Sequence, residues 1–178
     1  MTQVTLDKWA AMPRNRAEVA GGVLVAAPLL DTWHQLAVTR LAYRLDECLP
    51  DLVALARVEL LLAEEPLTIR VPDVLVTSLT ELNVRRASPT DVRLVIEVLS
   101  EGTVRTDRVT KFSEYAEVGI EHYWIVDLED PASMTTYRLI DGEYENFGEH
   151  TGKVSLDFDG TPLTLDLDAL TTRHAQRP

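Results

Sequence analysis

The segment from Arg93 to Leu99 constrains the fold more than any other part of the sequence. Its central residues are aliphatic at successive positions except for Glu97, so both faces of a strand here would meet apolar neighbours. Such a run is typical of a central strand covered on both sides, which predicts a layered α/β protein. An isolated buried carboxylate is costly or takes up a proton, and a nearby cation removes that cost. Glu97 therefore indicates either a structural ion pair or a metal site.

The rest of the sequence predicts a single domain over residues 1–178, because no long linker, repeat or low-complexity tract divides the chain. We expect an N-terminal hairpin at about residues 17–26, a core at about 32–128 and a β extension at about 133–170. The core should contain an αβββαβ succession of elements around a mixed sheet.

Two patterns support the first half of this core. Apolar residues recur at helical spacing from Trp33 to Leu49, and Pro50 follows to end the helix. Alternation of apolar and polar residues then predicts two strands, at residues 56–60 and 67–77, paired as an antiparallel hairpin.

Asp73 is a second carboxylate in an apolar context. Counting by twos from Leu67, it falls on the apolar side of its strand unless Pro72 introduces a bulge. Because Pro72 cannot donate a ladder hydrogen bond, the strand is predicted to be distorted or at an edge there. With Glu97 nearby, the result would be an oxygen-rich pocket of the kind that Mg²⁺ binds. The alternative is that Pro72-Asp73 is only a turn.

A second helix is predicted from Thr103 or Thr106 to Val118, before a strand at residues 123–126 that runs parallel to residues 93–99. Asp107, Lys111 and Tyr115 follow one another at intervals of four and share a helix face. Lys111 would thus be able to reach Glu97. The alternative is an exposed Asp107–Lys111 pair, which contributes little. A separate face, suited to packing on the sheet, carries Val109, Phe112 and Ala116.

Taken together, these segments resemble the PD-(D/E)XK nuclease superfamily, and more narrowly its Uma-two-type branch of restriction endonucleases. The similarity runs through most of the chain. It is carried by Glu18, Gly21, His34, Pro72-Asp73, Glu97-Val98-Leu99-Ser100, Asp107, Lys111, Tyr115, Gly119 and His122-Tyr123-Trp124-Ile125-Val126-Asp127.

This resemblance implies a restriction-endonuclease-like fold and assigns roles at the site. Asp73 and Glu97 match the metal-binding acids, and the backbone carbonyl of Val98 matches a further metal ligand. The superfamily's lysine should follow Glu97 by two residues, but this sequence has Leu99 there. Lys111 resembles the relocated lysine of this branch.

Four other residues are marked by the resemblance as supporting groups around the metal. They are Glu18, His34, Asp107 and Tyr115. Glu18 and His34 are also candidates for added metal ligands, and for His34 a structural role at the end of its helix is an equal alternative.

The implied activity is hydrolysis of DNA phosphodiester bonds by an endonuclease that uses Mg²⁺ or Mn²⁺. A net charge of −12 opposes tight binding to DNA, because affinity for phosphate backbones comes largely from basic residues, so we expect weak binding without a partner. A homodimer is expected because cutting both strands usually needs two sites. Cys48 is the single cysteine, no signal peptide is recognised and no apolar stretch is long enough for a bilayer, so a cytoplasmic protein is expected.

Two rival interpretations remain open at this point. The missing lysine at position 99 and the acidic charge favour a catalytically silent binding or regulatory module with the nuclease fold. A purely structural acidic cluster with no metal affinity is the other.

Overall fold

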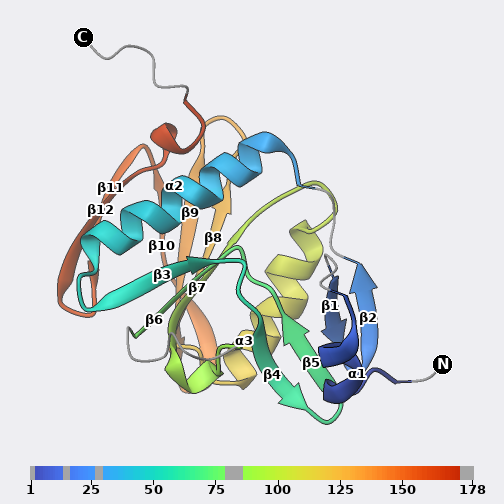
Figure 1. Cartoon of the computed structure of the whole chain (residues 1–178). Coiled ribbons are helices and arrows are strands. Elements are labelled where there is room, and N and C mark those ends of the chain that lie inside the picture. Colours follow the sequence, from blue (N-terminus) through green and yellow to red (C-terminus); the bar gives the residue numbers. More distant parts are fainter. Residues whose placement is uncertain (1–2, 14–16, 27–29, 79–85, 173–178) are drawn as a thin grey trace.

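The aliphatic segment around Glu97 forms β7, and it lies inside a six-stranded mixed sheet (Figure 1). The computed structural model describes residues 3–13, 17–26, 30–78 and 86–172. In the large sheet, β7 and β8 are parallel and the other neighbouring pairs are antiparallel, as the crossover argument predicts. In spatial order its strands are β10 (Glu143–Thr151), β9 (Ser133–Ile140), β8 (His122–Asp127), β7 (Val92–Val98), β6 (Val74–Ser78) and β3 (Leu52–Ala56).

Two smaller sheets flank the large one. The N-terminal hairpin is formed as predicted, with Gly21 and Gly22 at positive φ in its turn, and it belongs to a four-stranded sheet. In spatial order these strands are β2 (Val23–Ala26), β1 (Ala17–Ala20), β5 (Leu67–Arg70) and β4 (Leu60–Glu64). The C-terminal hairpin consists of β11 (Lys153–Phe158) and β12 (Thr161–Asp166).

The helices cover the two faces of the large sheet. The long helix α2 (Thr32–Cys48) begins at Asp31, whose side chain accepts a hydrogen bond from the His34 backbone, and it lies across one face (Figure 1). The opposite face is covered by a π-helical segment, η3 (Thr106–Lys111), that continues into α3 (Phe112–Glu117). Short helices complete the structure: α1 (Leu6–Ala11), η2 (Pro89–Asp91) and η4 (Asp168–Leu170).

Alternate residues of the central strands pack into different cores. Leu94 and Ile96 face α2 and the C-terminal hairpin, whereas Val95 packs with Tyr115 and Ile120 on the side of α3. Glu97, one position after Ile96, therefore points to the α3 side. The alternation of side chains along β7 thus directs the Glu97 carboxylate toward α3 rather than α2.

The predicted hairpin over residues 56–60 and 67–77 is wrong in one respect. Each predicted strand is divided, so that β3 and β6 pair in the large sheet while β4 and β5 pair in the smaller one. Arg57, at φ 57°, interrupts the first strand, and residues 71–73 around Pro72 interrupt the second. Both breaks lie where the chain passes from one sheet to the other.

The helix after β7 also differs from the prediction. Val109, expected to pack on the sheet, is 58% exposed, while Asp107, Lys111 and Tyr115 are buried. A π-helical segment has a longer repeat than an α-helix, so Val109 is displaced from the face of Phe112 and Ala116, whereas Asp107, Lys111 and Tyr115 stay on one side as predicted. Among the described residues, no helix has the length and apolar character needed to cross a bilayer.

Candidate active site

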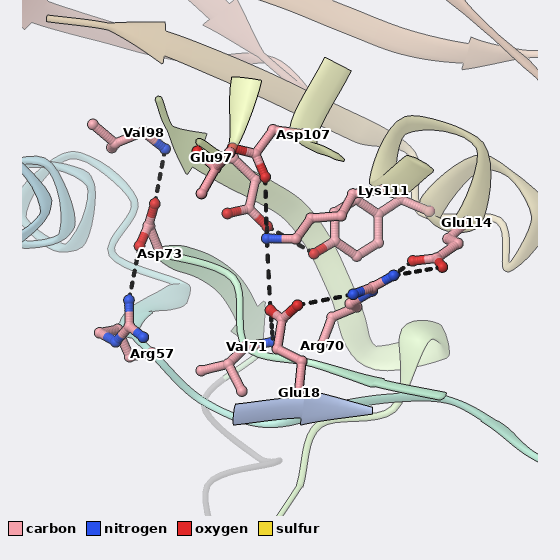
Figure 2. Close-up of polar contacts among 12 residues, drawn as sticks. Glu18, Arg57, Arg70, Val71, Asp73, Glu97, Val98, Asp107, Lys111 and Glu114 are labelled. Carbon is pink, nitrogen blue, oxygen red and sulfur yellow. Dashed lines mark hydrogen bonds and ion pairs between the residues drawn. The ribbon is translucent and has the colours of Figure 1, made fainter. Parts of the chain in front are cut away.

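Asp73 lies at the break between β5 and β6, and three groups hold its carboxylate. Its Oδ2 accepts a hydrogen bond of 2.9 Å from the Val98 backbone N–H and lies 3.2 Å from His34 Nε2. Its Oδ1 accepts a hydrogen bond of 3.1 Å from Arg57 Nη1. Because Val98 ends β7, these contacts hold Asp73 beside the C-terminal end of the strand that contains Glu97 (Figure 2).

Glu97 is 2% exposed and faces the helix, as its position in β7 requires. Its Oε1 accepts hydrogen bonds from Lys111 Nζ at 2.9 Å and from the Tyr115 hydroxyl at 2.8 Å. Burial raises the pKa of this carboxyl above its ordinary value; Lys111 opposes the shift and the neighbouring carboxylates, of which Asp73 is the strongest, add to it. The site therefore holds more negative charge than Lys111 alone balances.

Lys111 is 7% exposed and stands among three carboxylates. Its Nζ lies 2.9 Å from Glu97 Oε1, 3.2 Å from Asp107 Oδ1 and 3.6 Å from Glu18 Oε1. Burial alone would lower the pKa of this amine, but the charges of Glu97, Glu18 and Asp107 outweigh it and raise the pKa. Lys111 is therefore a positively charged ammonium at neutral pH.

Glu18 comes from the N-terminal hairpin and connects the site to a chain of ion pairs (Figure 2). Its Oε1 accepts a hydrogen bond of 3.0 Å from the Val71 backbone, and its Oε2 accepts one of 2.9 Å from Arg70 Nη1. Arg70, which is 2% exposed, also donates two hydrogen bonds to the carboxylate of Glu114, at 2.6 and 2.7 Å. Burial would raise the pKa of Glu18, but Lys111, the Val71 amide and Arg70 lower it overall.

His34 stands in the first turn of α2, with its Nε2 2.9 Å from the carbonyl oxygen of Val98 and 3.2 Å from Asp73 Oδ2. Burial would lower the pKa of the imidazole, but its hydrogen bond and charge interaction with Asp73 raise it overall. A single nitrogen of His34 thus bridges two of the atoms expected to bind metal. Within the described residues, its buried Nδ1 has no hydrogen-bond partner.

These groups line a cavity of about 190 Å³. Four carboxylate residues face it, Glu18, Asp73, Glu97 and Asp107, against two basic residues that carry a permanent charge, Arg57 and Lys111. In the part of the chain that the structure describes, the buried Oδ1 of Asp107 accepts no hydrogen bond, although Lys111 Nζ lies 3.2 Å away. Excess negative charge, a buried oxygen without a donor and a set of oxygen ligands all fit a hard divalent cation.

The geometry brings together the candidate catalytic, metal-binding and supporting residues. Asp73, Glu97 and Lys111 converge on the cavity, and so do the candidate supporting residues Glu18, His34 and Asp107, while Tyr115 contacts the cavity residue Glu97. Sequence reasoning missed two groups, Arg57 and Arg70. Both occupy polar positions of alternating segments, which predict a solvated side chain, so nothing in the local pattern distinguishes them.

A second group of possible metal ligands lies at the N-terminal end of β8. One ligand atom each from Glu121, His122 and Asp159 falls within 4.8 Å of the others. Arg93 lies 2.6 Å from Asp159 and 3.2 Å from Glu121, and Arg138 lies 3.1 Å from Glu121. Because arginine already neutralises these carboxylates, the group forms an ion-pair network rather than a metal site.

Comparison with known proteins agrees with the fold. Residues 5–169 match the Uma2 family, which is described as "Putative restriction endonuclease". A crystal structure described as "a putative nuclease belonging to DUF820 from Anabaena variabilis" superimposes with a TM-score of 0.72 and 18% identity, covering 94% of this chain and 97% of that one. The restriction-endonuclease-like fold is thereby confirmed. Among curated proteins, none matches the sequence. On the family match, which extends over most of its length, the chain belongs to the Uma2 family.

Proposed function

We propose that this protein is an endonuclease that hydrolyses DNA phosphodiester bonds with the help of Mg²⁺ or Mn²⁺. The observation that carries the proposal is the convergence of Asp73, Glu97 and the Lys111 ammonium on one cavity that reaches the surface. Membership in a family described as "Putative restriction endonuclease" supports the same reaction class.

In this proposal the carboxylates of Asp73 and Glu97 and the backbone carbonyl of Val98 would hold the metal. When bound, the ion lowers the pKa of its water ligand and offsets negative charge that develops on the phosphate. Asp73 is oriented for this role by the Val98 amide, and Glu97 by Tyr115 and Lys111. These hydrogen bonds hold the carboxylates in place before the ion arrives.

Lys111 takes the place of the superfamily lysine that is absent at position 99. Leu99 is buried in the apolar core on the α3 side together with Tyr115, so a leucine suits the packing there. Lys111, the last residue of η3, supplies the ammonium instead, and its Nζ lies 2.9 Å from Glu97 Oε1. From this position Lys111 orients the attacking water or donates a hydrogen bond to the phosphate in the transition state.

The surrounding residues fix the charge and position of these three groups. Glu18 and Asp107 keep Lys111 protonated through their charges, and Tyr115 donates to Glu97. His34 bridges Asp73 and the carbonyl of Val98, which positions both of them. We further propose that the chain is a single domain that works in the cytoplasm as a homodimer, since cleavage of both strands usually needs two sites.

The direct test is Glu97→Gln in a plasmid-cleavage assay across Mg²⁺ and Mn²⁺. Glutamine keeps the size of the side chain but binds a divalent cation poorly, so cleavage should be abolished. Glu117→Gln, an exposed change on α3, is the matched control and should retain full activity. Undiminished cleavage by highly purified Glu97→Gln would defeat the mechanism.

The second candidate function is a catalytically silent binding or regulatory module. Leu99 at the usual lysine position and the net charge of −12 are the observations that favour it. Calorimetric titration with Mg²⁺ or Mn²⁺ combined with the cleavage assay separates the two. Metal binding without turnover on any nucleic acid supports the module, and the absence of metal affinity at millimolar concentration supports a purely structural cluster.

A further inference from the structure

Arg57 lines the cavity and lies between β3 and β4 in the sequence. Its backbone has φ 57°, a left-handed conformation that is uncommon for residues other than glycine, asparagine and aspartate. Its N–H donates to the carbonyl of Asp73 at 3.1 Å, and its Nη1 donates to the Asp73 carboxylate at 3.1 Å. The chain therefore adopts an unfavourable conformation and directs a guanidinium at a candidate metal ligand.

The other basic groups nearby are already enclosed. Lys111 has three carboxylates within 3.6 Å and an 8% exposed side chain, His34 is buried, and Arg70 is held between Glu18 and Glu114. The Arg57 side chain is 28% exposed. Within the described residues, Asp73 is its one hydrogen-bond acceptor. Because a guanidinium has five N–H groups, most of its donors remain available to a ligand in the cavity.

We propose that Arg57 binds a phosphate of the DNA substrate. In the metal-free protein its guanidinium partly neutralises the charge of Asp73 that the metal would otherwise neutralise. This inference rests on the proposed nuclease function and adds a substrate-binding residue to it. With a divalent cation bound at Asp73, Arg57 would be repelled and its guanidinium would turn from the Asp73 carboxylate to the phosphate. A planar guanidinium donates to two phosphate oxygens at once, which suits it to this task.

The proposal predicts effects of opposite sign on two ligands. Removing the Arg57 charge removes a competitor for Asp73, so Mg²⁺ should bind more tightly, while DNA should bind more weakly. A residue that merely holds Asp73 in place would behave otherwise: its loss would weaken metal binding and leave the affinity for DNA nearly unchanged. The two roles therefore predict opposite changes in Mg²⁺ affinity, and only a phosphate-binding role predicts a loss of DNA affinity.

Arg57→Asn is the main variant, because asparagine tolerates the left-handed backbone and the fold is thereby preserved. Calorimetry with Mg²⁺ alone should show a dissociation constant about threefold to tenfold lower than that of the wild type. Fluorescence anisotropy with a short labelled DNA duplex in Ca²⁺ should show affinity weaker by about tenfold. The slope of log affinity against log salt should fall by about 0.9, the loss of one phosphate contact.

Two further variants complete the test. Arg57→Lys keeps the charge and should restore the salt slope while recovering only part of the DNA affinity, because an ammonium lacks the planar fork. Arg44→Gln changes an exposed arginine of α2 that pairs with Glu47; it is the control and should change neither ligand's affinity. Thermal unfolding of each variant shows that it remains folded.

Weaker Mg²⁺ binding by Arg57→Asn, or an unchanged salt slope, overturns the role of Arg57 while leaving the nuclease proposal intact if the wild type cleaves DNA. A wild-type protein that binds neither Mg²⁺ nor DNA overturns both.

Discussion

Glu97→Gln should stabilise the metal-free protein at alkaline pH even though it abolishes cleavage. Burial raises the pKa of Glu97 to about 8, from an ordinary value of 4.5, and the nearby carboxylates of Asp73 and Asp107 contribute. The folded state therefore binds a proton that the unfolded state has released. The stability of the wild type is full below about pH 4.5 and falls as the pH rises through about 8.

The size of the effect follows from this shift. One proton bound only in the folded state changes the free energy of unfolding by about 1.4 kcal/mol per pH unit, which gives an upper bound of about 5 kcal/mol over the whole window. The shift already includes the opposing effect of Lys111, and between pH 5 and pH 8.5 it corresponds to at most about 4 kcal/mol. Glutamine does not titrate, so Glu97→Gln loses this dependence. Its side-chain oxygen still accepts from Tyr115, and Lys111 keeps Asp107 and Glu18.

Urea unfolding of both proteins in a chelator, from pH 5 to pH 8.5, measures the difference. The free energy of unfolding of the variant should exceed that of the wild type by an amount that increases with pH. Saturating Mg²⁺ should make the wild type the more stable protein, since only the wild type keeps both carboxylates. Glu117→Gln is the control and should show a gap that does not vary with pH. A Glu97→Gln protein that is less stable than the wild type by the same amount at every pH would contradict a raised pKa of Glu97 in the folded state.

Three other perturbations have defined outcomes. Lys111→Met should abolish cleavage and lower the free energy of unfolding by about 3–5 kcal/mol in unfolding experiments, because it leaves buried carboxylates without their partner. Tyr115→Phe removes one hydrogen bond to Glu97 and should cost about 1–2 kcal/mol in stability while lowering kcat without abolishing cleavage. Arg70→Lys cannot reproduce the paired hydrogen bonds to Glu114, so both thermal stability and cleavage should fall, whereas the exposed Arg44→Lys should change neither.

The sequence predicted the order of the elements because apolar periodicity reports burial directly. The run around Glu97 identified a central strand, and the crossover rule gave its parallel neighbour β8. The convergence of Asp73 and Glu97 could also be expected, since both carboxylates interrupt apolar positions. In these cases the informative residue is out of place in its own segment.

The rest depends on contacts between distant segments. Arg70 looks like a solvated residue of an alternating strand, and its burial requires Glu18 and Glu114, which are 52 and 44 residues away in the sequence. Arg57 is likewise unremarkable until the strand breaks beside it. The exposed face of η3 was assigned wrongly because the helical repeat itself changes there, and composition does not report a π-helical segment.

That wider turn holds one residue more than an ordinary α-helical turn of the same span. Removing one residue from Thr106–Lys111 would let the segment close into an ordinary α-helix, and the parts on either side would keep nearly the same orientation because the tighter repeat compensates for the lost residue. Only the spacing of Asp107 and Lys111 along the helix would change, while α3 and its apolar contacts would keep their places. A lineage could thus alter the acidic surroundings of the lysine in one genetic event and still retain the scaffold.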